Sequence, residues 1–194
     1  MITETDRANI AVFVGRYAMK HTRTYPHPIE RVWRAVSTAE GLNAWYVPVW
    51  TVEPGLGGAW SCTYGNPSLE ALEASDLGFG HGVITAWDPR RLVDYGGQHR
   101  FELTEVDDGT RLDWTQTYDP ALRFPKLEAT LPGGNPGGPG YPMFPGGQAG
   151  NHVAADDLGD YLAGRPIHSV AGDAHWVELT RVYHAYFLAN LPAA

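Results

Sequence analysis

Imidazole, amide and phenol groups are the side chains of this sequence best suited to binding or catalysis. Those that fall beside apolar residues on predicted strands, or on a predicted helix, are His81, His99, Gln116, Tyr118, Asn151 and His152. A polar group buried in an apolar interior has to be hydrogen-bonded, so an inward-facing histidine or glutamine would select a ligand with a matching hydroxyl or carbonyl. The common alternative for each is an exposed side chain, or one that is satisfied within the protein.

Aromatic side chains are the second conspicuous group, with 7 Trp, 10 Tyr and 6 Phe among 194 residues. The candidates for a cavity wall are Trp33, Trp45, Trp60, Tyr64, Trp87, Phe101 and Trp114. Ligand cavities are mostly apolar with few polar anchors, although the same rings could form an ordinary packed core. We favour a cavity, because the small residues Ala154 and Ala155 on the facing helix leave volume unfilled. The predicted ligand site joins these rings to His81, His99, Gln116, Asn151 and Ala155.

The nucleophiles of the sequence lack the surroundings that covalent catalysis requires. Cys62 lies in a predicted strand with no marked base nearby, which is typical of a small core residue. No serine stands in a Gly-x-Ser-x-Gly elbow. The Gly-rich residues 133–140 lack the Lys-Ser/Thr ending of a phosphate-binding loop. If the protein is an enzyme, we expect general acid–base chemistry by His81, His99 or His152.

His152 and Asp156 are four residues apart on one face of a predicted helix, with Asp160 one turn further on. An imidazole and a carboxylate at this spacing can ligate a metal ion. However, the sequence has no His-Glu-x-x-His pattern, and three aspartates on a helix usually mark a solvated face. His175 and His184 fall on different turns and faces of the last predicted helix, so we interpret both as structural. We therefore expect no metal site and no cofactor.

Predicted strands and helices are segregated along the chain rather than alternating. Strands are predicted at 17–25, 49–53, 58–64, 82–87, 92–95, 101–106 and 110–118. Helices are predicted at 28–36, 38–45, 150–163 and 173–190, with one or two further helical turns at 68–74. The last strands form the clearest hairpin, with Phe101 and Trp114 on one side and charged residues on the other. This arrangement indicates the α+β class and a sheet that is covered on one face.

Residues 132–147 contain five Pro and seven Gly among sixteen positions, so neither a helix nor a central strand is expected there. Tyr141, Met143 and Phe144 within this loop could lie on the body as a lid, but we favour a surface insertion held by a few anchoring contacts. The helix predicted at 173–190 has a wide apolar stripe, which either packs on the domain or forms a homodimer contact.

Several motifs together resemble one known superfamily. The segment from Pro28 to Ala35 reads Pro-Ile-Glu-Arg-Val-Trp-Arg-Ala and is followed by Thr38 and Trp45. Further matching segments are Asp88-Pro89-Arg90-Arg91-Leu92-Val93, Phe101-Glu102-Leu103, Gly109-Thr110-Arg111-Leu112, and Gly150-Asn151-His152 through to Gly164-Arg165-Pro166. Over residues 17–166 the chain resembles the SRPBCC/START-like superfamily, and most closely the homologues of the activator of the heat-shock protein 90 ATPase.

The resemblance implies a helix-grip fold, in which a curved antiparallel sheet of about six to seven strands surrounds a long C-terminal helix. It also implies a hydrophobic ligand cavity. It implies no single reaction, because the superfamily includes transporters, cyclases, hydrolases and chaperone cofactors. Asn151 stands where the family commonly has Trp, which opens space or places an amide at one end of the cavity. The loop 132–147 and the tail after residue 166 look like additions.

The composition predicts one domain over residues 1–194, with 43% hydrophobic and 19% charged residues. The net charge of -8, without any run of basic residues, argues against a nucleic-acid partner. The single cysteine, Cys62, allows no internal disulfide, which suits a reducing compartment. The acidic N-terminal residues show no signal-peptide pattern, and no apolar stretch is long enough for membrane insertion. We therefore expect a cytoplasmic protein.

The function we expect is binding of a small hydrophobic molecule, such as a lipid, a polyketide or an aromatic metabolite, between the sheet and the C-terminal helix. The aromatic candidates and the lack of catalytic motifs favour this function. Two alternatives stay open. One is a cyclase- or hydrolase-like enzyme that uses a cavity histidine as acid or base. The other is an interaction protein that modulates a chaperone, which depends only on the resemblance.

Overall fold

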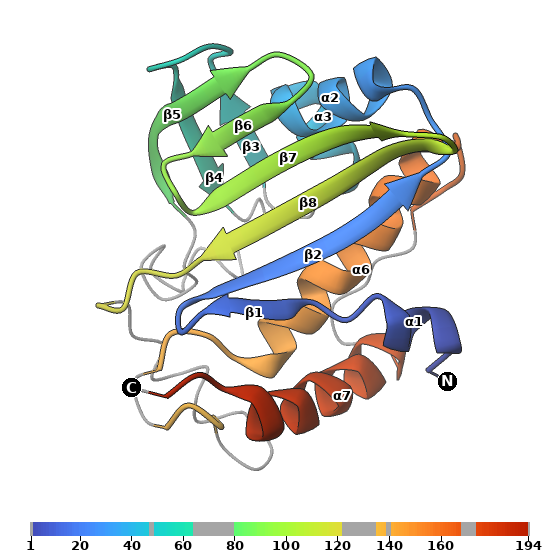
Figure 1. Cartoon of the computed structure of the whole chain (residues 1–194). Helices are drawn as coiled ribbons and strands as arrows, with labels where there is room; N and C mark the ends of the chain where they lie inside the picture. Colours follow the sequence, from blue (N-terminus) through green and yellow to red (C-terminus); the bar gives the residue numbers. More distant parts are fainter. Residues whose placement is uncertain are drawn as a thin grey trace.

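A curved sheet wraps around one long helix in the computed structural model, which describes residues 2–46, 49–63, 80–121, 135–138, 141–167 and 174–193 (Figure 1). The described strands are β1 (Val12–Gly15), β2 (Ala18–Tyr25), β3 (Val49–Val52), β4 (Ala59–Thr63), β5 (His81–Asp88), β6 (Leu92–Tyr95), β7 (His99–Val106) and β8 (Gly109–Thr117). The described helices are α1 (Glu4–Ala8), α2 (Ile29–Ser37), α3 (Ala39–Trp45), α6 (Pro145–Leu162) and α7 (Ala174–Asn190). The predicted α+β helix-grip architecture is confirmed.

The sheet has eight strands in the order β1-β2-β8-β7-β6-β5-β4-β3, and each pairs antiparallel with its neighbours. Strands adjacent in sequence are adjacent in the sheet, except that β2 pairs with β8. The prediction of six to seven strands is therefore slightly low, because β1 was missed. Its four residues read Val-Phe-Val-Gly, and three of them are exposed, so no alternation marks the strand.

The β7–β8 hairpin shows how alternation produces one apolar face. Phe101 pairs with Trp114, and Leu103 pairs with Leu112. All four side chains are buried on the inner face of the sheet, as predicted. Gly109, which follows the turn, has a φ of 135°, a conformation that side chains with a Cβ rarely adopt. The turn chemistry and the alternation thus fix the register together.

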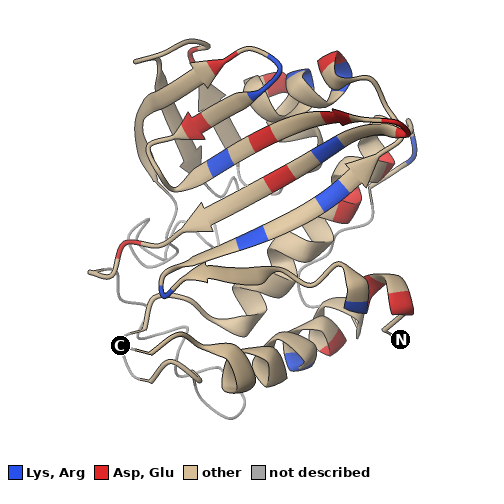
Figure 2. Ribbon diagram, viewed as in Figure 1, with Lys and Arg blue, Asp and Glu red and all other residues tan. Residues whose placement is uncertain are grey.

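The outer face of the sheet carries charged residues of both signs (Figure 2). Arg100 on β7 lies 3.2 Å from Asp94 and 3.1 Å from Glu102, while Arg111 on β8 lies 2.6 Å from Asp113. Such pairs near the surface each contribute little to stability. They keep this face hydrated, so the apolar side chains of the sheet are directed inward against α6.

Hydroxyl and indole groups join the helices to the inner face of the sheet. Tyr25 on β2 donates a hydrogen bond to the carbonyl of Ala155 on α6 at 2.7 Å. Tyr95 on β6 donates to the Val36 carbonyl of α2 at 3.0 Å. Both tyrosines are buried, and each phenol O–H finds its acceptor on a helix carbonyl, as a buried donor requires. These bonds fix how α2 and α6 lie on the sheet.

Helix α6 begins at Pro145, about five residues before the predicted start, so the expectation of no helix over 132–147 is wrong at its end. Pro145 occupies the first turn, where its missing N–H costs nothing. Close packing explains the glycines that follow. A Cβ at Gly146 would lie 3.0 Å from Trp176, and a Cβ at Gly147 would lie 3.0 Å from Phe144. The glycine content that argued against a helix therefore serves packing within one.

Helix α7 packs on the domain, which resolves one alternative for its apolar stripe. Leu179, Tyr183 and Phe187 are fully buried beside α6 and the first strands. Tyr141 and Met143 join the same second core, in keeping with the anchoring contacts expected for that loop. The helix also reaches the sheet edge, since the Tyr183 hydroxyl accepts from the Ala11 N–H at 2.9 Å and the Tyr186 hydroxyl from the Phe13 N–H at 3.2 Å.

Two predictions concern residues outside those that the structure describes. They are the helical turns at 68–74 and the placement of Tyr64. Within the described part of the chain, no helix combines the length and the apolar character needed to cross a membrane.

Candidate ligand-binding site

Rings from five strands and the end of α3 meet on the inner face of the sheet. The group, here called the aromatic wall, comprises the buried residues Trp45, Tyr46, Trp50, Trp60, Tyr95, His99, Phe101 and Trp114. Trp114 lies at its centre, with ring centroids 5.3 Å from Tyr46 and 5.4 Å from Phe101. Trp50 and Trp60 stack at 5.7 Å and extend the group along β3 and β4. Five predicted site residues, Trp45, Trp60, His99, Phe101 and Trp114, are thus brought together.

Three other predicted residues lie apart from the aromatic wall. Trp33 on α2 and Trp87 on β5 form an edge-on pair with centroids 5.1 Å apart, and both are only half-buried. They pack against the margin of the core. His81 is exposed at the start of β5. The sequence identified these residues by type, but Trp33 and Trp87 lie at the margin of the core and His81 is exposed.

His99 is the imidazole of the aromatic wall. Its Nδ1 accepts a hydrogen bond from the Trp114 indole N–H at 3.3 Å. Burial lowers the pKa of His99 to about 3, so the ring is neutral at physiological pH. A neutral imidazole that accepts at Nδ1 carries its proton on Nε2. His99 therefore offers a hydrogen-bond donor at Nε2.

A connected set of buried amides and phenols adjoins the aromatic wall where β8 faces α6. We call it the amide–phenol network, and it comprises Tyr46, Gln116, Tyr118, Gln148 and Asn151. Gln116 Oε1 accepts from the Tyr118 hydroxyl at 2.8 Å and from the Asn151 amide. Gln148 Nε2 lies 3.4 Å from the same oxygen and 3.3 Å from the Tyr118 hydroxyl. The Tyr46 hydroxyl donates to Asn151 Oδ1 at 3.0 Å, which links the network to the aromatic wall.

The predicted residues Gln116, Asn151 and Ala155 all face the interior at this junction. Asn151 places an amide between α3 and β8, which is one of the two outcomes expected where the family commonly has Trp. Ala155 lies one turn further along α6, and its carbonyl is held by Tyr25. The small side chains of Ala154 and Ala155 are buried against the sheet.

Two indole N–H groups in the aromatic wall have no hydrogen-bond partner among the residues that the structure describes. They are Nε1 of Trp50 and Nε1 of Trp60, and both atoms are buried. By contrast, Trp45 donates to the Ala35 carbonyl at 3.0 Å. A buried donor without an acceptor costs about 1–3 kcal/mol. Trp50 and Trp60 therefore present two unused donors close together on one apolar surface.

The three histidines considered as acid–base groups do not share a site. His81 is exposed, and His99 belongs to the aromatic wall. His152 lies on the opposite face of α6, where its Nδ1 is 3.1 Å from the Tyr183 hydroxyl of α7. Only His99 is placed to contact a molecule held between the sheet and α6.

Sequence reasoning missed four residues of this region. They are His21, Tyr46, Trp50 and Gln148. Trp50 and His21 could have been predicted from the sequence, because each lies on the inward side of a predicted strand. Gln148 was hidden by the Gly/Pro-rich composition around it. Its Oε1 lies 3.1 Å from His21 Nε2, and burial lowers the pKa of His21 to about 3, so this imidazole is neutral too.

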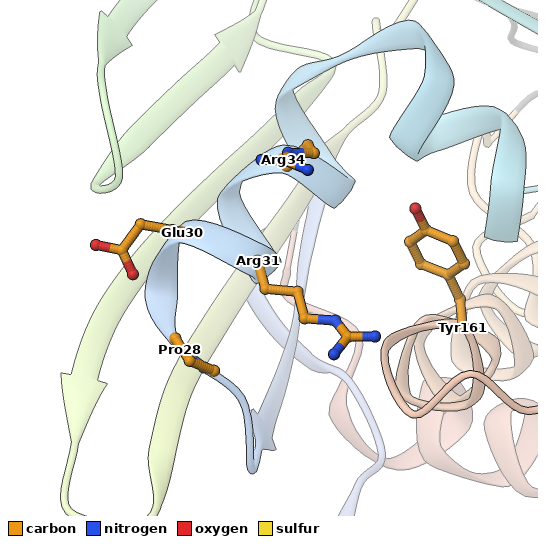
Figure 3. Close-up of a pocket in the computed structure, with 5 residues that line it drawn as sticks. All are labelled: Pro28, Glu30, Arg31, Arg34 and Tyr161. Atoms are coloured by element: carbon orange, nitrogen blue, oxygen red, sulfur yellow. The ribbon is translucent and has the colours of Figure 1, made fainter.

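A separate surface pocket of about 550 Å³ lies between α2 and the end of α6. Its lining residues are Pro28, Glu30, Arg31, Arg34 and Tyr161. Figure 3 shows the Arg31 side chain extending from α2 toward the Tyr161 ring. At its rim, Glu30 forms an exposed ion pair with Arg90 at 3.1 Å. None of the predicted ligand residues lines this pocket, and its charged lining does not suit an apolar molecule.

Solved structures with similar folds cover nearly the whole chain. A conserved protein of unknown function from Enterococcus faecalis has 13% identity and a TM-score of 0.62, over 97% of this chain and 96% of that one. CalU16 from Micromonospora echinospora has 18% identity and a TM-score of 0.55, over 91% and 89%. A protein from Bordetella parapertussis has 18% identity and a TM-score of 0.53, over 93% and 90%. At these identities the likeness concerns the fold alone.

Comparisons of sequence say more about the family of this chain than the likeness of fold does. Among curated proteins, no sequence matches the chain. The family model described as polyketide cyclase / dehydrase and lipid transport matches residues 17–138, which run from β2 through every later strand. The match covers more than half of the chain and contains all eight residues of the aromatic wall. The chain belongs to the polyketide cyclase / dehydrase and lipid transport family.

Proposed function

We propose that this protein binds a small, largely apolar molecule between the aromatic wall and α6, and that the molecule carries at least one hydrogen-bond acceptor. Membership of the polyketide cyclase / dehydrase and lipid transport family supports a hydrophobic ligand. The observation that carries the proposal further is the pair of buried, unpartnered indole N–H groups of Trp50 and Trp60. A ligand carbonyl, ether or hydroxyl oxygen would satisfy them.

The amide–phenol network supplies the second polar element of the proposed site. Its amides and hydroxyls already bond one another, so it forms a fixed polar group beside the aromatic wall. A lipid, polyketide or aromatic metabolite with an oxygen at each end would match this arrangement. Pre-organised polar groups improve affinity and specificity, because the ligand does not have to order them.

Ligand binding can be tested on the purified chain. Native mass spectrometry would detect a co-purified molecule, and displacement of anilinonaphthalene sulfonate by fatty acids and aromatic polyketides would rank ligand classes. Trp60→Phe keeps an aromatic ring, though a smaller one, and removes the donor, so affinity for an acceptor-bearing competitor should fall about 2- to 10-fold. Trp33→Phe, outside the aromatic wall, should leave that affinity unchanged.

The proposal fails if no ligand co-purifies and no competitor displaces the dye. It also fails if Trp50→Phe and Trp60→Phe both bind every competitor as the unaltered chain does.

A cyclase- or hydrolase-like alternative would assign the acid–base role to His99. Turnover of a bound competitor that disappears in His99→Phe would favour that alternative. The chaperone-modulating role has no support in the contacts described above, and a pull-down from native lysate would test it separately.

A further inference from the structure

Four side chains that can ligate metals converge on the face of α6 that is turned away from the sheet. Asp6 comes from α1, His152 and Asp156 come from α6, and His175 comes from the first turn of α7. One ligand atom each from Asp6, Asp156 and His175 lies within 4.8 Å of the others. His152 Nε2 lies 3.6 Å from Asp156 Oδ2 and 3.9 Å from Asp6 Oδ1, and His175 Nε2 lies 3.6 Å from Asp6 Oδ1.

Each carboxylate uses one oxygen for structure and directs the other to the centre of this group. Asp6 Oδ2 accepts from the Thr3 N–H at 2.6 Å and from the Thr3 hydroxyl at 2.8 Å, as part of the α1 cap. Asp156 Oδ1 accepts from Arg23 Nε at 3.1 Å. The oxygens that face the imidazoles, Asp6 Oδ1 and Asp156 Oδ2, are the ones left over.

A ring nitrogen of His152 without a partner is independent evidence for a bound ion at this position. Its side chain is completely buried, and its Nε2 has no hydrogen-bond partner among the described residues. The Tyr183 hydroxyl oxygen, which accepts from the Ala11 N–H, has a second lone pair for the Nδ1–H of His152. In that tautomer, Nε2 directs a free lone pair toward the two carboxylate oxygens. Metal-bound histidines are commonly held in this way by a partner on the other ring nitrogen.

We propose that Asp6, His152, Asp156 and His175 bind one divalent cation of the zinc type. Two imidazole nitrogens and two carboxylate oxygens form a donor set that Zn²⁺ accepts in a closed tetrahedral site. With bonds of about 2.0–2.2 Å, ligand atoms of such a site are ~3.4 Å apart. The separations of 3.6 Å and 3.9 Å around His152 and Asp6 are slightly wider, so small side-chain movements would close the site.

Charge also favours a cation at this position. Two carboxylates face one cationic side chain, that of Arg23, which is buried and pairs with Asp156. The two carboxylates and Arg23 together thus carry one uncompensated negative charge, which a bound cation would offset.

The sequence alone argued against this site, because it offered only His152 and Asp156 on one helix. Asp6 and His175 are distant in sequence and are brought in by α1 and α7. All four residues lie outside the segment 17–138 that matches the family model. The proposed ion would therefore join three helices outside the matched segment, and would hold α1 and α7 against the back of α6.

Zinc binding can be tested on the full chain without a polyhistidine tag, after EDTA treatment and dialysis. Titration with ZnCl₂ followed by calorimetry should give one equivalent, and Co²⁺ should give the intense visible absorption of a tetrahedral site. His175→Ala is the informative variant, because His175 is 36% exposed and its loss should not prevent folding. Loss of this ligand should weaken Zn²⁺ binding at least about tenfold, since even second-shell partners contribute 10–100-fold.

His184→Ala is the matched control, because His184 lies on the same helix and outside the group of ligands. It should bind Zn²⁺ as the unaltered chain does and show the same rise of Tm with Zn²⁺, whereas His175→Ala should lose that rise. The proposal is overturned if the dialysed chain binds no Zn²⁺, or if His175→Ala and Asp156→Asn both bind it as tightly as the unaltered chain.

Discussion

Asn151 on α6 joins the end of α3 to β8. Its Oδ1 accepts from Tyr46 and its amide donates to Gln116, so a single side chain satisfies polar groups from both sides of the interior. Side chains of this kind have large effects when removed, because their partners stay buried.

Asn151→Leu should therefore lower the free energy of unfolding by about 1–3 kcal/mol, because the Tyr46–Asn151 hydrogen bond is lost and Gln116 loses a donor. Urea unfolding followed by tryptophan fluorescence would measure the change. Asn190→Ala, at an exposed position of α7, should change it by less than about 0.5 kcal/mol. Equal effects of the two substitutions would contradict the role given to Asn151.

At the residue scale, the sequence predicts which side chains are buried better than it predicts which of them meet. Alternation placed Phe101 and Trp114 on the inner face, and the structure agrees. Trp33 and Trp87 were grouped with them by residue type alone, but they form their own half-buried pair. The missing information is the twist of the sheet and the angle at which α2 crosses it, which no local pattern carries.

Helices α2 and α3 meet at a close backbone approach. A Cβ on Gly41 of α3 would lie 2.3 Å from the Arg34 carbonyl oxygen and 2.6 Å from Ala35 Cα. Both contacts are with backbone, so the helices themselves would have to separate.

Gly41→Ala should destabilise the protein by about 1–3 kcal/mol, although alanine is the better helix former, because the added methyl group overpacks the α2–α3 junction. Gly150→Ala is the matched control in α6, where an added Cβ meets only Trp176 Nε1 at 3.8 Å. That change should be neutral or stabilising by up to about 1 kcal/mol. Thermal unfolding of both variants gives the comparison, and a stabilising Gly41→Ala would contradict the assigned contact.

The second core makes α7 a structural part of the domain. Phe187→Ala should cost about 3–5 kcal/mol, since the ring is completely buried against Phe13, with centroids 4.9 Å apart. Leu188→Ala, at the adjacent position with 67% exposure, should have an effect within about 0.5 kcal/mol. Chemical denaturation would separate them, and similar midpoints would mean that α7 does not contribute to the core.

Element boundaries were predictable where periodicity is strong and unpredictable where composition misleads. Strand β6 was predicted at its observed limits, and α3 ends at Trp45 as predicted. The start of α6 was missed, because its glycines are explained only by the aromatic residues that pack on them, namely Phe144 and Trp176. A contact between distant segments cannot be derived from either segment alone.

The whole molecule should lose stability as the pH falls below 6.5, because three histidines are buried in the neutral form. Burial lowers the pKa values of His21, His99 and His152 to about 3, from the ordinary histidine value of 6.5. Between these values the unfolded chain binds protons that the folded chain does not. Each imidazole should therefore reduce the free energy of unfolding by ~1.4 kcal/mol per pH unit as the pH drops from about 6 to 4.

Urea unfolding at several pH values, in EDTA, would measure this slope. His99→Phe should reduce it by roughly one third, because one of the three buried histidines that take up a proton on unfolding is removed. Replacing the exposed His81 by Asn should leave the slope unchanged. A slope that is the same in His99→Phe and in the unaltered chain would show that His99 is not buried in its neutral form.

At the scale of the fold, the helix-grip architecture followed from the order of elements and from the resemblance of a few motifs. The second core did not, because it depends on how α1, α7 and the segment around Tyr141 return to one face of α6. The sequence predicts the apolar stripe of α7, but it does not decide whether the stripe packs on the domain or on a second copy of the chain.

The contact between α7 and the first strand also bears on self-association. A sheet edge normally presents free N–H groups, to which a strand of another molecule can add. Val12 and Val14 are exposed at this edge. The N–H groups of Ala11 and Phe13, however, donate to the hydroxyl oxygens of Tyr183 and Tyr186. A second chain would have to displace both phenols to extend the sheet here, so this edge is closed to strand addition and protected against edge-to-edge aggregation.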